Sequence, residues 1–265
     1  MKNFVIDLNY CNGCYSCQIG CKDEHCGNDW TPYAKPQPET GHFWLKIDET
    51  VRGQVPKVYV TYVPVICQHC EDAPCIKAYP DFIYRREDGL VIIDPVKCTA
   101  NRNITDACPY GAIYWNDTLA IAQKCTGCAH LMDDGWDKPR CADNCPTDAI
   151  VMGEEKDLKD KIAKAEVLHP EYGTKPRVYY INLPKMWIAG TAYDPAEMEV
   201  YIGAKVTCKG GSQGTMTTET DEWGDFWFRN LDDDAEYTVT IEAGGKSKTF
   251  ECFTDKCLNI GDIAM

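Results

Sequence analysis

Short apolar runs alternate with cysteine-rich loops in the first part of the chain. The runs are VYVTYVPVIC, GLVIIDP, AIYW, LAIAQ and AIVMG, and turn residues or cysteine loops separate them. Runs of this length that are rich in β-branched and aromatic residues are typical of short strands. Because the pattern of loop and strand recurs, it favours a pair of repeated small units over one continuous sheet.

The pattern changes twice between Gly153 and residue 195. In EEKDLKDKIAKAE, Leu158, Ile162 and Ala165 fall on one face of a helix, which predicts a surface helix. Residues 169–195 are rich in proline and aromatic residues but have no clear period. We predict an extended arm here, which either links two domains or lies along a partner or the first domain.

From about residue 196 polar and apolar residues alternate in runs such as GAKVTCKG and AEYTVTIEAGG, with Gly or Asp turns between them. This alternation predicts a small all-β sandwich domain. The segment resembles the carboxypeptidase-regulatory-like or collagen-binding B-type sandwich. Cys208, Cys252 and Cys257 lie inside it, and we interpret each as a structural thiol.

Seventeen cysteines in 265 residues far exceed ordinary usage. A disulfide scaffold is disfavoured because the count is odd, because MKNFVIDLNYC lacks the apolar core of a signal peptide, and because most cysteines have metal-ligand spacings. The formal charge of -14 disfavours nucleic acid and anionic membranes as partners. No run reaches the ~18 apolar residues of a membrane span, so we expect a cytoplasmic chain without one.

Four cysteine groups carry the candidate chemistry. Group one, CNGCYSCQIGC, has the x2-x2-x3 spacing of a 4Fe-4S ferredoxin, and group four, CTGCAHLMDDGWDKPRCADNCP, keeps four cysteines around an insertion. Group two, CQHCEDAPCIKAYP, has Tyr79 in place of its fourth cysteine. Group three, CTANRNITDACP, keeps Cys98 and Cys108 but has Asn101 and Ile104 at the two middle ligand positions.

In two-cluster ferredoxins the last cysteine of each motif binds the cluster of the other motif. Applied to groups one and four, this exchange gives two complete quartets, which we call set one and set two. Groups two and three give a third quartet, set three. The sets are Cys11, Cys14, Cys17 and Cys145 (set one); Cys125, Cys128, Cys141 and Cys21 (set two); Cys67, Cys70, Cys75 and Cys108 (set three).

A fourth quartet would retain only Cys98. The losses therefore fall on one site, and we predict three 4Fe-4S clusters, with one ancestral cluster removed cleanly. Zinc explains three cysteines within seven residues and the Cys-Pro dipeptides poorly. Cys26 and Cys98 are left over as free thiols. The nearby cations Lys97, Lys124, Lys138 and Arg140 would offset the negative charge of the clusters and raise their potentials.

Over about residues 1–185 these motifs resemble the iron–sulfur subunits of the dimethyl sulfoxide reductase superfamily of molybdenum enzymes. The resemblance implies an α+β fold with two ferredoxin-like halves. We therefore expect a double ferredoxin-like iron–sulfur domain at 1–168, an arm at 169–195 and a β-sandwich at 196–265. It also implies a heterodimer with a large catalytic subunit, which carries molybdenum on two pterin guanine dinucleotides, and no catalytic residue in this chain.

Within the superfamily, the segments QHCEDAPC, CPYGAIYWN and GTKPRVYY, the lost cluster and the C-terminal sandwich resemble a subgroup whose partner subunits act on polyphenols. We therefore expect an electron-transfer subunit of such an enzyme. The residues leave two alternatives open. The chain could serve another molybdenum reductase, hydroxylase or dehydroxylase, or it could be an independent polyferredoxin.

Overall fold

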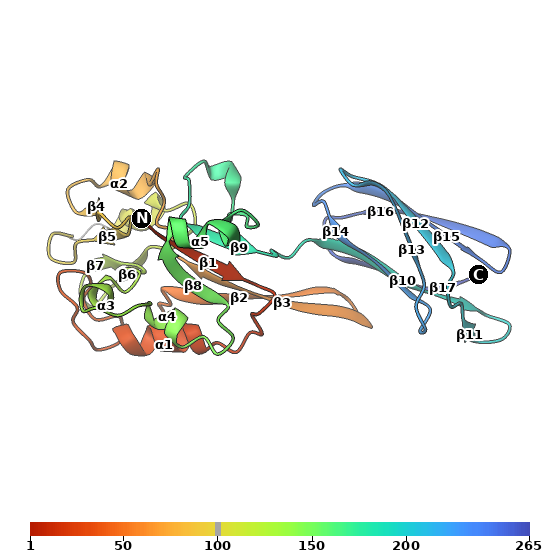
Figure 1. The fold of residues 1–265 in the computed structure, drawn as a ribbon, viewed down its shortest axis with the longest axis horizontal. Helices are drawn as coiled ribbons and strands as arrows, with labels where there is room; N and C mark the ends of the chain where they lie inside the picture. Colours follow the sequence, from red (N-terminus) through yellow and green to blue (C-terminus); the bar gives the residue numbers. More distant parts are fainter. Residues whose placement is uncertain (99–101) are drawn as a thin grey trace. The chain divides into compact units, whose positions relative to one another are not determined.

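A computed structural model describes residues 1–98 and 102–265 of the protein. The chain divides into two compact units (Figure 1). Unit 1 comprises Met1–Glu49 and Tyr62–Leu183, and unit 2 comprises Thr50–Thr61 and Pro184–Met265. All four cysteine groups therefore lie in unit 1.

A three-stranded sheet of order β8-β1-β9 brings together distant parts of unit 1. The central strand β1 (Lys2–Asp7) pairs antiparallel with β8 (Ile150–Glu154) and parallel with β9 (Val178–Ile181). Because β1 is bonded along both edges, its middle residues are fully enclosed, and Phe4 and Ile6 join Tyr180 of β9 in the main core. The start of the chain and residues near 180 are thus fixed to each other.

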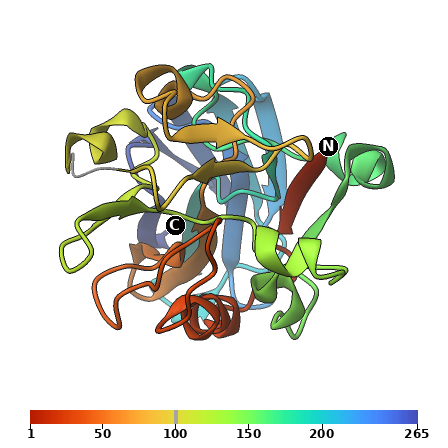
Figure 2. The ribbon, with the colours of Figure 1, turned by 90° about the vertical axis from the view of Figure 1, so that its left-hand side faces the viewer.

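The remaining elements of unit 1 are short and are separated by loops (Figures 1 and 2). Two small ladders pair β4 (Ile83–Arg85) with β5 (Val91–Ile93) and β6 (Tyr114–Asn116) with β7 (Ile121–Gln123). The helices are α1 (Ser16–His25), α2 (Pro74–Ala78), α3 (Ala129–Asp133), α4 (Arg140–Asp143) and α5 (Glu155–Ile162), with 3-10 turns η1 (Arg102–Ala107) and η2 (Pro170–Tyr172). None of the described helices has the length and apolar character needed to cross a membrane.

A long hairpin is divided between the two units. Its strands are β2 (Leu45–Gln54) and β3 (Lys57–Ile66). At the tip, the Lys57 ammonium lies 2.5 Å from the Asp225 carboxylate and 5.6 Å from the ring centre of Trp227. The Gln54 side chain accepts a 2.7 Å hydrogen bond from the Asn259 amide. Residues 50–61 are therefore part of unit 2 by contact, although they lie far from its other residues in sequence.

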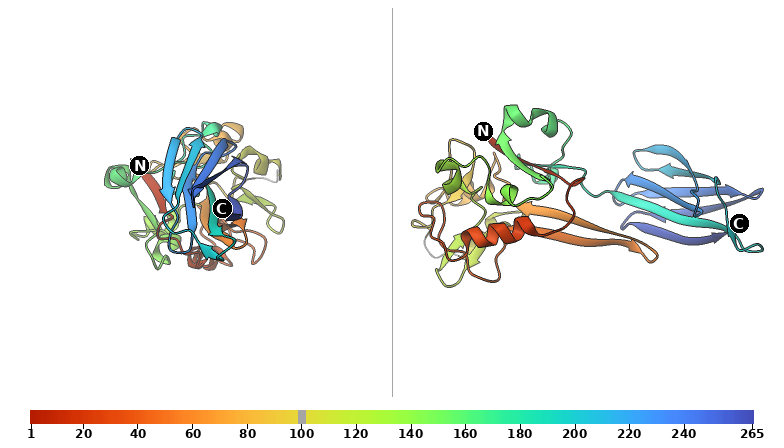
Figure 3. Two further views of the ribbon diagram at one scale, coloured as in Figure 1. Left: turned by 90° about the vertical axis from the view of Figure 1, so that its right-hand side faces the viewer. Right: turned by 60° about the horizontal axis from the view of Figure 1, so that its bottom comes forward.

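Unit 2 consists of two four-stranded sheets that share one core (Figure 3). In the first sheet, β10 pairs with β11, β14 and β17, and the second has the order β13-β12-β15-β16. The strands are β10 (Met186–Asp194), β11 (Glu199–Val200), β12 (Lys205–Gly210), β13 (Gly214–Glu219), β14 (Asp225–Leu231), β15 (Glu236–Ala243), β16 (Lys246–Phe253) and β17 (Leu258–Ala264). Inward residues such as Val206, Phe226 and Ile241 are at most 1% exposed, as expected when alternate positions face a core.

The predicted arm at 169–195 requires correction. Its middle forms β9 in unit 1, where Val178 and Tyr180 are fully buried, and its end forms β10 in unit 2. Pro184 begins unit 2, earlier than the predicted boundary at 196. The physical reason is that burial of these aromatic and apolar side chains is favourable, so Tyr180 packs in the main core of unit 1 and Ile188 in the core of unit 2.

This boundary predicts the outcome of truncation. Since every cysteine of the three sets lies in unit 1, a chain ending at Leu183 should keep the visible absorbance of its clusters when prepared anaerobically. A chain ending at Pro195 should instead aggregate on gel filtration, because β10 would expose Trp187 and Ile188 on an unpaired edge. Loss of absorbance from the shorter chain would mean that unit 2 supplies a ligand.

Candidate iron–sulfur sites

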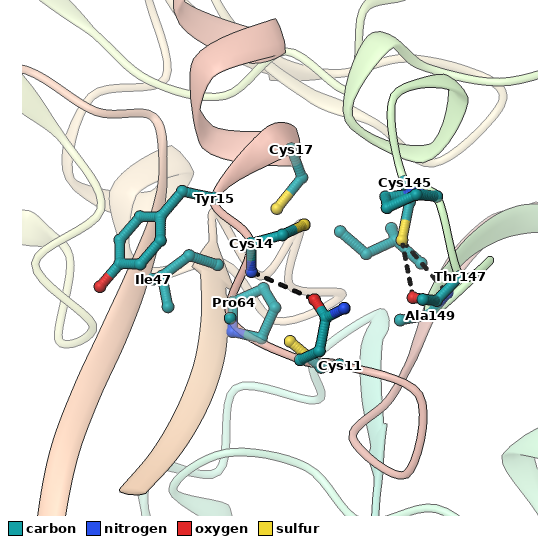
Figure 4. Close-up of a pocket in the computed structure, with 13 residues that line it drawn as sticks. Cys11, Cys14, Tyr15, Cys17, Ile47, Pro64, Cys145, Thr147 and Ala149 are labelled. Carbon is teal, nitrogen blue, oxygen red and sulfur yellow. Dashed lines mark hydrogen bonds between the residues drawn. The ribbon is translucent and has the colours of Figure 1, made fainter.

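The cysteines of set one surround a single cavity. Cys11, Cys14 and Cys17 lie on the loop before α1 and at its first turn, and Cys145 lies on a facing segment after α4 (Figure 4). The space between them is about 320 Å³, part of which is open to solvent. The structure thus brings three cysteines of group one together with the last cysteine of group four. Cys14 is exposed, so this site lies at the surface of unit 1.

Set three has the same arrangement in another cavity. Cys67, Cys70 and Cys75 line it together with Cys108, and the space is about 340 Å³. Cys67 and Cys70 come from the loop between β3 and α2, Cys75 lies in the first turn of α2, and Cys108 follows η1. Lys124, which directly precedes Cys125 of set two, lines this cavity as well.

The four cysteines of set two lie deep in unit 1, each at most 8% exposed. Burial raises the pKa of Cys21 and of Cys141 well above the ordinary thiol value, and charge repulsion from Cys125 and Cys128 raises both further. The set is thus assembled from α1, from the CTGC loop and from α4.

Left-handed backbone shapes the first C-x-x-C loop of groups one, two and four. The residue directly before the second cysteine has a positive φ in each: 70° at Gly13, 64° at Gly127 and 44° at His69. Glycine adopts this conformation without strain, whereas histidine does so at a cost. His69 is held by a 3.0 Å hydrogen bond from the Val91 amide to its Nδ1 and by stacking on Phe4. The turn lets backbone amides point toward the space that the sulfurs surround.

The two Cys-Pro loops also repeat one geometry. In each, the amide four residues after the cysteine donates to its sulfur, from Ala112 to Cys108 at 3.4 Å and from Ala149 to Cys145 at 3.2 Å. The residue three positions after the cysteine is left-handed in both loops. Cys108 and Cys145 are the ligands predicted to be exchanged between motifs, so the same local structure presents both.

Burial dominates the ionisation of the other thiols. It raises the pKa of Cys17, Cys70 and Cys128 to about 12. Burial also acts to raise the pKa of Cys145, but hydrogen bonds from Thr147 and from backbone amides outweigh it and lower that pKa. Since a metal binds the thiolate, the positive charge of bound iron would have to hold most of these sulfurs in their ionised form.

The donor set fits a bound iron–sulfur group. In sets one and three the thiols line a cavity, and no group of three or more Cys, His, Asp or Glu in residues 1–98 and 102–265 is arranged to hold a single metal ion. His69 keeps its proton on Nε2, because Nδ1 accepts from Val91, yet this buried nitrogen has no hydrogen-bond partner. His69 does not line the cavity of set three, so the fit of this site to a cluster rests on its four thiols.

Sequence reasoning missed a segment that supports set three. The amides of Glu71 and Asp72 donate to the carbonyls of Lys175 and Thr174 at 2.8 and 3.0 Å, which ties the group-two loop to residues 174–177. The Thr174 hydroxyl lies 2.6 Å from that of Tyr110 and lowers the pKa of Cys70, which burial raises. Its signal was present in GTKPRVYY, but the prediction placed these residues in an arm.

An apolar core takes up the positions of the missing quartet. Ile104 is 1% exposed and Cys98 is 4% exposed, and both belong to a cluster with Ile93 and Ile113. Tyr79 packs against this cluster. Asn101 lies outside the described residues. Hydrocarbon side chains therefore surround the one thiol that remains.

The other thiols lie apart from the three sets. Cys208 and Cys252 belong to the shared core of unit 2, and Cys257 packs with Trp187. Cys26 follows the end of α1. These positions agree with structural roles in packing.

Comparison with known proteins gives one family model and several full-length or partial relatives. The model, described as a 4Fe-4S dicluster domain, matches residues 58–155. The chain is 41% identical to the pyrogallol hydroxytransferase small subunit of Pelobacter acidigallici, over 98% of each protein. It is 31% identical to the iron–sulfur subunit of the arsenate respiratory reductase of Shewanella sp. strain ANA-3, over 67% of this chain and 94% of that protein. It is 35% identical to one subunit of the anaerobic dimethyl sulfoxide reductase of Escherichia coli K12, over 66% of this chain and 85% of that subunit.

Two cysteines at one apolar cluster provide a matched test of the ligand sets. Cys98 is buried in the cluster around Ile104, and the half-buried Cys108 packs against it, so alanine at either position removes the same side chain. Only Cys108→Ala should lower the iron content, from about twelve to about eight per chain, if one cluster is lost. Iron and sulfide analysis of anaerobically prepared protein measures this. Equal losses in both variants would contradict the assignment of Cys108.

Proposed function

This protein belongs to the iron–sulfur subunits of the dimethyl sulfoxide reductase superfamily of molybdenum enzymes, and on this premise we propose that it transfers electrons in a heterodimer that acts on polyphenols. The observation that carries the proposal is the 41% sequence identity to the pyrogallol hydroxytransferase small subunit, in an alignment that covers 98% of both proteins. The match thus includes both the cysteine groups and the C-terminal residues.

In this proposal the three thiol sets hold three 4Fe-4S clusters, each of which can gain or lose one electron. The lining of the cavities supports the assignment for sets one and three, and for set two the support is that its four buried thiols lie close enough to shift the pKa of one another. The loops before Cys14, Cys70 and Cys128 orient amides toward the bound group. The apolar residues of unit 1 exclude water from it, which leaves set one as the most exposed site.

The catalytic site is proposed to lie on the large partner subunit, with molybdenum held by two pterin guanine dinucleotides. This chain would conduct electrons and would contribute no catalytic residue. Its thiols are enclosed by packed loops, whereas acid–base or nucleophilic catalysis needs a positioned group beside an open pocket. The substrate class follows from the relative's name, pyrogallol, and the reaction would move a hydroxyl group between polyphenols. We further propose that the complex acts in the cytoplasm.

A second candidate rests on the partial relatives. Because the chain also resembles subunits of arsenate and dimethyl sulfoxide reductases, the partner could be a reductase of an oxyanion or a sulfoxide. An independent polyferredoxin is the third possibility. The three readings differ in what copurifies with the chain.

The test is anaerobic purification of the native complex by a tag on this chain, followed by metal analysis and activity assays. We expect a large molybdenum-containing subunit, and hydroxyl transfer with pyrogallol-type substrates that is absent from the isolated chain. Reduction of arsenate or dimethyl sulfoxide without activity on polyphenols would favour the reductase. A chain that elutes without a partner would contradict the heterodimer.

A further inference from the structure

Lys124 is a lysine enclosed between two thiol sets. It is 3% exposed, it directly precedes Cys125 of set two, and its side chain lines the cavity of set three with Cys75 and Cys108. It lies at the end of β7, whose pairing with β6 fixes the backbone there. Set two and set three therefore share this one side chain.

The Lys124 ammonium is bonded to neutral groups. It donates to the carbonyl oxygen of Val91 and, at 3.0 Å, to that of Cys125. No carboxylate of residues 1–98 or 102–265 forms an ion pair with it. A buried charge is costly unless an opposite charge or polar groups compensate for it. The nearest candidates for compensation are the thiolates of the two sets.

Within the described part of the chain, Lys22, which follows Cys21 of set two, also donates only to carbonyls, those of Pro38 and His42, but it is less buried than Lys124. Three other cations near the cysteine groups are exposed or paired. Lys97 is 69% exposed and lies near Asp94, and Arg140 is paired with Glu24 and Asp143. Lys138 is exposed. Solvent and carboxylates screen these charges, whereas the charge of Lys124 is not screened in this way.

The thiols respond to Lys124 in both sets. Burial raises the pKa of Cys75, Cys108 and Cys125, and the positive charge of Lys124 opposes that rise in all three. Lys124 lines the cavity of set three and directly precedes Cys125 of set two, but it does not line the cavity of set one.

We propose that Lys124 is a positioning charge that raises the reduction potentials of the clusters on set two and set three together. The inference rests on the ligand sets given under the proposed function. Reduction adds one negative charge to a cluster, and a fixed positive charge beside it stabilises the reduced form. A single lysine shared by two sets makes both clusters easier to reduce by the same substitution-sensitive charge.

The test compares Lys124→Met and Lys124→Gln, which remove the charge, with Lys124→Arg, which keeps it. Glutamine also retains a hydrogen-bond donor, so it separates loss of charge from loss of hydrogen bonds. Lys97→Met is the matched control, since it removes an exposed charge. Redox titrations followed by electron paramagnetic resonance, with iron analysis of each full-length protein in its complex, supply the potentials and the loading.

In both neutral variants the one-electron equilibrium of two clusters should shift toward the oxidised form by about tenfold. This corresponds to a reduction potential that is lower by about 59 mV. The reduction potential of the third cluster should stay near the wild-type value. All three potentials of the arginine variant and of the Lys97→Met control should do so as well. An unchanged set of potentials at full iron loading would overturn the role of Lys124, as would an equal shift of all three clusters. If only the two neutral variants lost iron, the charge of Lys124 would be needed for cluster assembly, and its role in setting potentials would be overturned. Low iron in the unmodified chain would contradict the ligand sets themselves.

Discussion

The rest of the structure depends on holding buried thiols close to one another. Burial raises the pKa of most of these sulfurs, and each thiolate in a set repels the others, so the sets are unfavourable unless positive charge and hydrogen bonds compensate. Bound iron supplies most of that charge. The protein adds amide donors, of which those from Ala112 and Ala149 are the clearest, and the ammonium of Lys124. The fold of unit 1 is therefore expected to be stable mainly with its clusters bound, since metal binding and folding are coupled in such sites.

This constraint explains why unit 1 consists of short elements. A loop that places three sulfurs around one cavity uses residues that a long helix or strand would otherwise contain. Its ends must then be fixed by other contacts. The ladder of β4 with β5 positions Val91 to bond His69, and the segment 174–177 positions the group-two loop. Secondary structure in unit 1 serves mainly to anchor the ligand loops, whereas unit 2 is stabilised by an alternating apolar core.

Spacing, together with the ligand exchange of two-cluster ferredoxins, predicted the three sets, and in the structure the cysteines of set one and of set three each line one cavity. The short strands were also predictable, since their apolar runs are bounded by turns. The arm was not, because β10 is enclosed on both faces and so lacks the period of a half-buried strand. Nor could the sequence show that residues 50–61 pack with unit 2, since the contact of Lys57 with Asp225 joins distant segments. Lys124 could not be distinguished from Lys97 or Lys138 by sequence, because burial is decided by the tertiary structure.

The apolar core at the missing quartet limits how this chain can change. Restoring a fourth cluster would require cysteines at Tyr79, Asn101 and Ile104, and it would also require space where Ile104 is now 1% exposed among other apolar side chains. Replacing isoleucine with a smaller residue in such a core leaves a void that costs about 2–5 kcal/mol for the largest truncations. The step at Ile104 therefore destabilises the packing before any cluster can form. The packing around Ile104 thus opposes the return of a fourth site in this part of unit 1.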